Sequence, residues 1–211
     1  MQRRSLLLGA ALVGAVRLDA LAQPAPAYRV RGFRSASFGL REAEVRAALA
    51  RDFPAAAAGV RHVENPAEGT TALVLPLPAL EPGPGPARVS YVFGASSQRL
   101  IHVSVVWQSD GAIDAAGRAR YAAAGSQLAA YFRALPWGPK ASAVPSPAGP
   151  NGLTLFVGID EAGAGVEVRV LGVGTVDPQG RAGPEPTGPA QLRVAYHANV
   201  GAPDVRATAR A

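Results

Sequence analysis

The sequence predicts an α+β fold in which an antiparallel sheet of about seven to eight strands carries two helices on one face. Two observations lead to this prediction. Segments with strand-like alternation follow one another in runs, and only two segments have helical spacing, in the order strand, helix, four strands, helix, three strands. Short polar or glycine-rich turns join neighbouring strands, as in antiparallel hairpins. Repeated βαβ units would instead need a helix between successive strands.

The first 22 residues have the three parts of an export signal. Arg3 and Arg4 precede an apolar run from Leu6 to Val16, and Ala20-Leu21-Ala22 forms a small-x-small cleavage site. A run of about eleven residues is shorter than the ~20 that span a bilayer. We therefore expect a periplasmic or secreted bacterial protein with no membrane span after cleavage. The paired arginines are similar to twin-arginine signals, and the general secretory route stays open.

Composition excludes several classes of protein. The chain has no cysteine, which rules out disulfides, thiolate metal sites and acylation of a lipoprotein cysteine. Its formal net charge is +6, but the basic residues are scattered and do not cluster with aromatic residues, so we expect no nucleic-acid partner. The 211 residues and 48% apolar content fit one domain with a sizeable core.

The mature chain is expected to begin with an extended leader at residues 23–27, followed by a single α+β domain over 28–198 and a tail over 199–211. Residues 28–33 form a candidate edge strand. From Leu40 to Phe53 the apolar residues follow helical spacing, and Pro54 ends the helix.

The start of this helix carries a resemblance to a known fold. Residues 38–46, Phe-Gly-Leu-Arg-Glu-Ala-Glu-Val-Arg, resemble the Phe-Gly-Met-Ser/Thr-Glu-x-x-Val motif that opens the first helix of many exported bacterial α+β proteins. These include the small lipoprotein of the outer-membrane β-barrel assembly machine, and the fold is shared with the β-lactamase inhibitor proteins. Arg41 stands where the motif has a Ser or Thr cap, which leaves Glu44 without its capping-box partner. The whole chain also resembles uncharacterised exported proteobacterial proteins.

Two hairpins follow the first helix. In the first, residues 59–64 and 70–77 are joined by a five-residue turn that places Glu64 opposite Thr70. On this register one face carries Val63, Thr71, Leu73, Leu75 and Leu77, and the other carries Val60, His62, Glu64, Thr70, Ala72 and Val74.

The second hairpin spans residues 88–108, with a turn at 94–98 that places Phe93 opposite Arg99, Tyr91 opposite Ile101 and Val89 opposite Val103. Alternation then gives an apolar face with Val89, Tyr91, Phe93, Ile101, Val103, Val105 and Trp107. The other face is mixed and carries Arg88, Ser90, Val92, Leu100, His102, Ser104 and Val106.

The second helix is expected from Asp114, a good N-cap, to Leu135, with Pro136 as its stop. Three further strands are expected at residues 153–159, 166–173 and 191–198. A helix followed by hairpins thus occurs twice, and a divergent duplication near residue 110 stays an open alternative.

The sequence predicts no catalytic residue, no cofactor and no metal site. His62, Glu64 and His102 could in principle form a two-His-one-carboxylate set. A four-strand meander would place the two histidines roughly 14 Å apart, whereas Zn–N bonds are ~2 Å long. No Gly-x-Ser-x-Gly elbow or phosphate-binding loop that opens a helix occurs. The adjacent carboxylates Asp160 and Glu161 are expected in a solvated turn.

The difference between the two sheet faces leads to a functional hypothesis: a non-enzymatic periplasmic protein-binding or envelope-associated module with an unknown partner. The candidate binding face consists of His62, Glu64, Thr70, Ser90, His102 and Ser104. Trp137, between a proline and a glycine, is a candidate exposed anchor. An inhibitor of a secreted enzyme is an alternative implied by the resemblance to the inhibitor proteins, and an enzyme of unrecognised type is a further one. The partner and the oligomeric state stay open.

Overall fold

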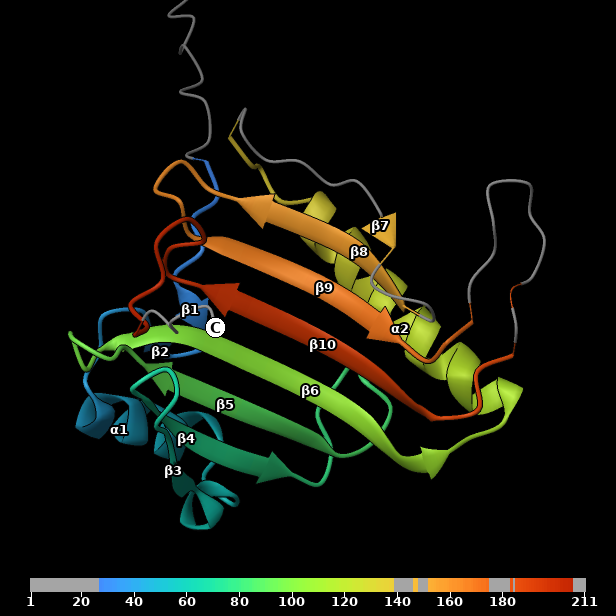
Figure 1. Ribbon diagram of the computed structural model, residues 1–211, viewed down its shortest axis with the longest axis horizontal. Coiled ribbons are helices and arrows are strands. Elements are labelled where there is room, and N and C mark those ends of the chain that lie inside the picture. The colour runs from blue at the N-terminus through green and yellow to red at the C-terminus, as the bar shows by residue number, and fades with distance from the viewer. Residues whose placement is uncertain (1–26, 139–145, 148–151, 175–182, 184, 207–211) are drawn as a thin grey trace, which may run out of the picture.

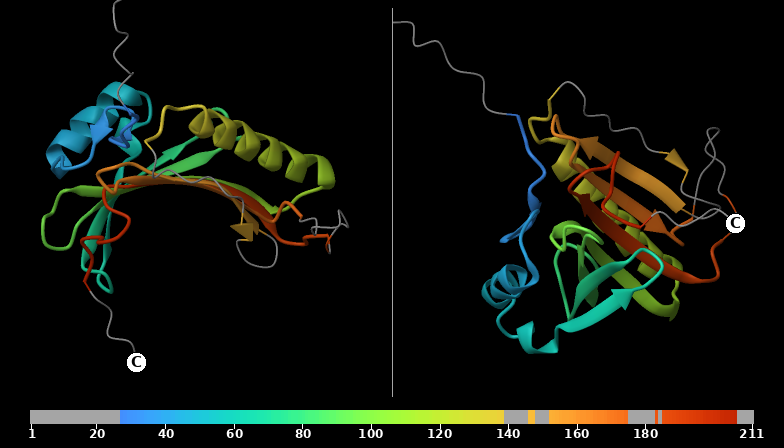
Figure 2. Two further views of the ribbon diagram at one scale, coloured as in Figure 1. Left: turned by 90° about the horizontal axis from the view of Figure 1, so that it is seen from above. Right: turned by 60° about the vertical axis from the view of Figure 1, so that its left-hand side comes forward.

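A computed structural model of the chain describes residues 27–138, 146–147, 152–174, 183 and 185–206. An eight-stranded antiparallel sheet, with strand order β3-β4-β5-β6-β10-β9-β8-β7, forms its centre (Figure 1). The helices lie over one face, on the convex side of the arched sheet (Figure 2). The predicted α+β class with an antiparallel sheet is confirmed. No helix in the described ranges is long and apolar enough to cross a membrane.

The chain order of the elements repeats a simple pattern, in which one helix is followed by four strands. The elements are β1 (Gly32–Phe33), β2 (Ala36–Ser37), α1 (Glu42–Asp52), the 3-10 turn η1 (Ala57–Gly59), β3 (Arg61–Asn65), β4 (Thr70–Leu77), β5 (Ala87–Phe93), β6 (Leu100–Ala112), α2 (Ala115–Arg133), β7 (Ser146–Pro147), β8 (Gly152–Ile159), β9 (Gly165–Leu171) and β10 (Pro189–His197). The two four-strand groups join where β6 pairs with β10, the last strand of each group.

The prediction of an edge strand at residues 28–33 is wrong. Only Gly32–Phe33 forms a strand, and it pairs with Ala36–Ser37 outside the main sheet. Backbone contacts hold the residues before it against other parts of the chain: Tyr28 N donates to Pro136 O at 2.8 Å, and Val30 N donates to the Asp160 carboxylate at 3.0 Å. These contacts occupy the N–H groups that an edge strand would have used.

Both helices begin close to the predicted positions. Asp114 caps α2 by accepting the Gly117 N–H at 2.7 Å, as expected. At α1 the capping box is half formed, because the Glu44 carboxylate accepts the backbone N–H of Arg41 at 2.8 Å. An arginine side chain has no acceptor, so it cannot form the reciprocal bond. Glu44 thus lacks its reciprocal capping-box bond, as the arginine at position 41 implies, but its carboxylate still accepts the N–H of the N-cap residue.

The first hairpin differs from the predicted register by one residue. Its turn contains four residues, 66–69, so Glu64 pairs with Thr71, and His62 pairs with Leu73. A shift of one residue moves every side chain of a strand to the other face. His62 and Glu64 therefore lie on the helix-covered side of the sheet, opposite to the predicted side.

The second hairpin also has a different register, but most of its faces are as predicted. Tyr91 pairs with Val103, a shift of two residues that preserves the alternation. A bulge then brings Leu100 opposite Phe93. Leu100 is consequently buried in the core, whereas the half-buried Ile101 lines a cavity with His102. The predicted faces of Leu100 and Ile101 are thus exchanged.

The main core lies between the helices and the convex face of the sheet. It includes the predicted apolar residues Val89, Tyr91, Phe93, Val103, Val105 and Trp107. Trp107 is also held by a hydrogen bond from its indole Nε1 to Leu80 O at 2.7 Å. Because this core occupies the convex side, the concave side is the sheet face that the helices leave uncovered (Figure 2).

Candidate binding site on the concave face

A cavity of about 750 Å³ lies on the concave face of the sheet, over the start of β6 and the end of β10. Its floor is formed by the sheet, through His102, Arg193 and His197, and part of its wall by residues 198–205 after β10. A smaller, more open depression of about 450 Å³, lined partly by Gln108 and Tyr121, contains no histidine. Ligand sites in proteins commonly enclose 300–1,000 Å³. Both volumes fall in this range, but the larger cavity is more enclosed and contains the two histidines, so it is the better candidate site.

Two histidines face each other in its floor. His102 on β6 and His197 on β10 are directly paired residues in the antiparallel register. Their Nδ1 atoms are 3.1 Å apart, and their ring centroids are 4.4 Å apart. An antiparallel pair on one face brings side chains into this kind of contact without any loop to position them.

Arg193 favours one direction for the hydrogen bond between the two histidines. One Nη of Arg193 lies 3.5 Å from Nε2 of His102. A guanidinium can only donate, so Nε2 of His102 is the acceptor, and its proton resides on Nδ1. His102 therefore donates from Nδ1 to Nδ1 of His197. The remaining proton of His197 is then on Nε2, which becomes a donor.

Both histidines are neutral at neutral pH. Burial lowers the pKa of His102 to about 3, with further lowering by His197 and Arg193. Burial also lowers the pKa of His197, followed by the charge of Arg193, while Glu167 opposes this shift. Charge repulsion adds to the effect of burial. Two imidazoles in contact beside a cation favour the uncharged form, since a second positive charge would be repelled.

Arginines form a row across the concave face. The strand registers align Arg88 on β5, Val106 on β6, Arg193 on β10 and Arg169 on β9. Arg169 is paired with Glu167 at 3.2 Å. Arg193 donates from Nε to Ser104 Oγ at 3.1 Å. Over the described ranges, no carboxylate oxygen lies within 4 Å of the Arg193 guanidinium.

The segment after β10 is fastened to the turns at the rim of the cavity. The Asp204 carboxylate accepts the backbone N–H groups of Ser96 at 3.0 Å and Ser97 at 2.9 Å. Hydrogen bonds from Ser97, and then from Ser96, lower the pKa of Asp204 to about 2. The N–H of Arg206 donates to Glu68 O at 2.8 Å. Residues 199–205, expected as part of a tail, therefore contribute a wall of the cavity.

The structure brings together only part of the predicted binding face. Ser90 pairs directly with Ser104 on the concave side, next to His102. The register places Thr70 on that side as well, but it is only 3% exposed.

The other predicted residues lie elsewhere. Glu64 is on the convex side with His62, whose Nδ1 is 3.3 Å from Glu42 of α1. Trp137 is half-buried, with its ring against Gly158 and edge-to-face with Tyr28, so it is not an exposed anchor. Both corrections have a local cause, the shifted register of the first hairpin and the aromatic cluster at the end of α2.

Arg193 and His197 were missed by sequence reasoning, although a signal for them exists. In residues 191–197 the polar side chains Gln191, Arg193 and His197 alternate with Leu192, Val194 and Tyr196. The alternation assigns them to one face of β10. The alternation does not show which strand pairs with β10, because that pairing is a contact between the two halves of the chain.

The chain matches no protein-family model, no curated protein and no solved structure. The resemblance of residues 38–46 to exported α+β proteins thus stays a prediction. Within the described ranges, no group of three or more His, Asp and Glu residues is arranged to hold a metal ion.

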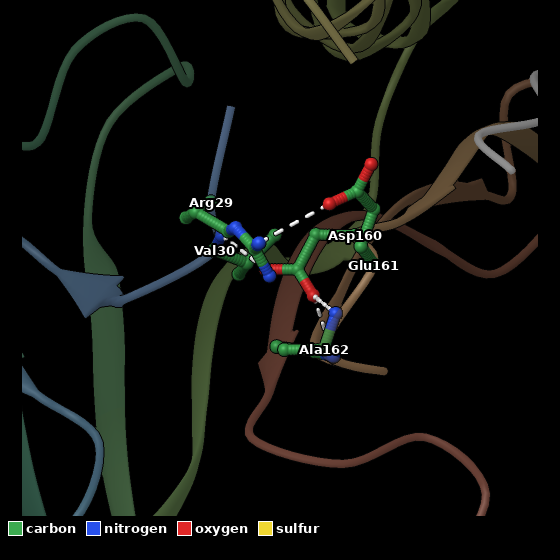
Figure 3. A network of polar contacts seen from close by, with 6 residues as sticks. Arg29, Val30, Asp160, Glu161 and Ala162 are labelled. Carbon is green, nitrogen blue, oxygen red and sulfur yellow. Dashed lines mark hydrogen bonds and ion pairs between the residues drawn. The ribbon is translucent and has the colours of Figure 1, made fainter. Parts of the chain in front are cut away.

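A second polar cluster lies just after the C-terminal end of β8 (Figure 3), at the same end of the sheet as the histidine pair. Asp160 is only 4% exposed and accepts N–H groups from Val30, Ala162 and Ala164 at 3.0, 2.8 and 3.1 Å. Its neighbour Glu161 is exposed and pairs with Arg29 at 3.2 Å. The expectation of a solvated turn is right for Glu161 and wrong for Asp160. With all its contacts to backbone groups, Asp160 joins the N-terminal segment to the β8–β9 turn.

Proposed function

We propose that the chain is an exported, non-enzymatic binding module of the bacterial envelope, and that the concave face of its sheet holds a protein partner. One observation carries the proposal: the face without helices has a cavity of about 750 Å³, whose floor combines an arginine and a histidine pair with no carboxylate beside the arginine in the described ranges. Concave surfaces with a few convergent polar groups are the usual location of binding sites.

The chemistry of the cavity favours binding over catalysis. A serine nucleophile needs a base within hydrogen-bond reach. Here the Ser104 hydroxyl accepts from Arg193, and the two imidazoles are bonded to each other. Both imidazoles of the cavity floor are thus engaged in contacts that fix the surface of the sheet.

Site-directed photo-crosslinking in cells tests the proposal. A photoreactive amino acid would replace exposed Arg88 or Val200 on the concave side, or exposed Tyr131 on α2 as the control on the opposite side. We expect one protein adduct from positions 88 and 200 and none from 131.

The same adduct should weaken in a chain that also carries Ser90→Ala, His102→Ala and Ser104→Ala, with circular dichroism showing that the fold is retained. Equal adducts from position 131, or an adduct that the triple variant leaves unchanged, would contradict a concave binding face.

A further inference from the structure

The guanidinium of Arg193 is satisfied only by neutral groups in the described part of the chain. Its Nε donates to Ser104 Oγ, and one Nη approaches Nε2 of His102. The side chain is half-buried and lines the cavity. A partly desolvated cation of this kind forms stronger hydrogen bonds with an anion than with a neutral acceptor. The floor of the cavity therefore favours a negatively charged group.

A second donor lies on the same strand. The tautomer that the Arg193 contact favours leaves the proton of His197 on Nε2, and His197 also lines the cavity. Arg193 and His197 are four residues apart on β10, with only the methyl group of Ala195 between them on that face. Ala195 itself is only 1% exposed and pairs with Glu167 on β9, so its methyl group is not part of the cavity floor. His102 contacts both side chains, at 3.5 Å from Arg193 and 3.1 Å from His197. An anion in the cavity above His102 would therefore have one donor on each side.

The rest of the cavity is mainly apolar. Val92 and Ile101 line it from the sheet, and Val200 and Val205 from the segment after β10. The two acids in the lining, Glu68 and Asp204, belong to the turn and the segment at the rim. Both oxygens of Asp204 already accept backbone N–H groups. One end of the cavity thus suits a single negative charge, and the walls suit a hydrocarbon chain.

We propose that this cavity binds a monocarboxylate attached to an apolar chain, with the carboxylate between Arg193 and His197 and the chain against Ile101 and Val200. The inference rests on the proposed binding function of the concave face. Two sources supply this chemistry: the C-terminal carboxylate of a protein partner that ends in an apolar residue, and a free medium-chain fatty acid.

The three histidines of the chain provide a direct test. Imidazole NMR signals of the purified chain would be followed during titration with decanoate, using decanol as the uncharged control. We expect decanoate to shift the signals of His102 and His197. The signal of His62, on the other side of the sheet, should stay in place. Shifts of equal size with decanol, or a decanoate titration that leaves both cavity histidines unchanged, would overturn the proposal.

Calorimetry on variants tests the assigned contacts. Arg193→Gln should weaken decanoate binding by about tenfold or more, because it removes the charge that the carboxylate faces. His197→Phe, which keeps a ring but removes the donor, should also weaken it and provides a second variant if the first folds poorly. Exposed Arg51 on α1 is the charge-matched control, and Arg51→Gln should change the affinity by less than about twofold since salt screens distant charges. Unchanged affinity in both cavity variants would contradict the assignment.

A peptide ending in Leu distinguishes the two sources of the carboxylate. Binding of the free acid but not of its C-terminal amide supports a protein C-terminus as the ligand. Binding of decanoate alone supports a fatty acid, and in that case the cavity assignment stands while the protein-partner part of the proposed function fails. If neither probe shifts His102 and His197, the cavity assignment fails, and the crosslinking experiment still tests the concave face separately.

Discussion

His102 and His197 are cross-strand neighbours whose Nδ1 atoms lie 3.1 Å apart, although 95 residues separate them in the chain. Their contact exists only because the last strands of the two halves, β6 and β10, pair at the centre of the sheet. Burial keeps both rings neutral, since it lowers both pKa values. The pair therefore makes the stability of the fold sensitive to acid.

We expect the free energy of unfolding to fall between pH 7 and pH 4. The pKa of His102 is about 3 in the folded chain and about 6.5 in the unfolded chain, so the unfolded chain binds more protons in this window. The stability is complete above pH ~6.5 and is lost as the pH falls toward 3, by up to about 3 kcal/mol for one such residue at pH 4. Urea unfolding at several pH values measures this change in the free energy of unfolding.

His102→Gln should flatten this pH dependence, and His62→Gln, outside the pair, is the matched control. Arg193, Glu167, Glu68 and Asp204 also face the pair or line the cavity beside it. Protonation of these carboxylates is common to all three chains, so the difference between curves isolates the histidine. A curve for His102→Gln that falls as steeply as that of the unsubstituted chain would contradict the buried neutral pair.

Replacement of Asp160 should weaken the attachment of the N-terminal segment. Asp160→Asn leaves a single oxygen for three backbone N–H groups and turns an NH₂ group toward one of them. We expect a loss of about 2–3 kcal/mol in the free energy of unfolding. Glu161→Gln, which removes only the exposed pair with Arg29, should cost less than about 0.5 kcal/mol. Equal effects of the two substitutions would show that the buried carboxylate has no special role.

Side chains of the sheet lie close against α2 at Gly125. A Cβ atom on Gly125 would lie 2.6 Å from Cγ1 of Val170 on β9. In an exposed helix, Gly→Ala stabilises by roughly 1 kcal/mol. Here the clash should reverse the sign and destabilise by about 1–3 kcal/mol, because α2 or β9 must shift.

Ser126→Ala, at the next, exposed position of α2, is the control and should be neutral or slightly stabilising. Thermal or denaturant unfolding distinguishes the two directions. A more stable Gly125→Ala chain would mean that the helix moves away from β9 at little cost.

Residue alternation correctly predicted most of what β5 and β6 bury, because burial on one face follows directly from the period of a strand. Val89, Tyr91, Val103 and Trp107 are all in the core, as expected. The register of the hairpins was less predictable, because it depends on the number of turn residues. One residue at the 66–69 turn was enough to move His62 to the helix side. At Ile101 a bulge, which has no reliable sequence signature, changed the face of two residues.

Only part of the candidate site was predicted, and the reason is not the register of the hairpins. Ser90, His102 and Ser104 belong to one hairpin, so local pairing placed them together. Arg193 and His197 approach them from a strand almost a hundred residues later, and only the topology of the whole sheet brings them there. The half of the site that depends on local contacts was accessible from the sequence, whereas the half that depends on β10 was not.

The last prediction concerns the wall of the cavity. Asp204→Asn should release the segment after β10, because the carboxylate that accepts the N–H groups of Ser96 and Ser97 becomes a neutral amide with one acceptor. Hydrogen exchange at these two amides, corrected for intrinsic rates, should accelerate by about tenfold or more. Exposed Asp110 at the end of β6 is the control, and Asp110→Asn should leave both amides protected.

The pH dependence of the same protection identifies the carboxylate as its cause. The pKa of Asp204 is lowered to about 2, so its charge and both hydrogen bonds persist as the pH falls from 7 to 4. Protection of Ser96 and Ser97 in the unsubstituted chain should therefore hold over this range and decline only as the pH approaches 2. Loss of protection already near pH 5, with the core amides of β5 still protected, would mean that another group fastens the segment.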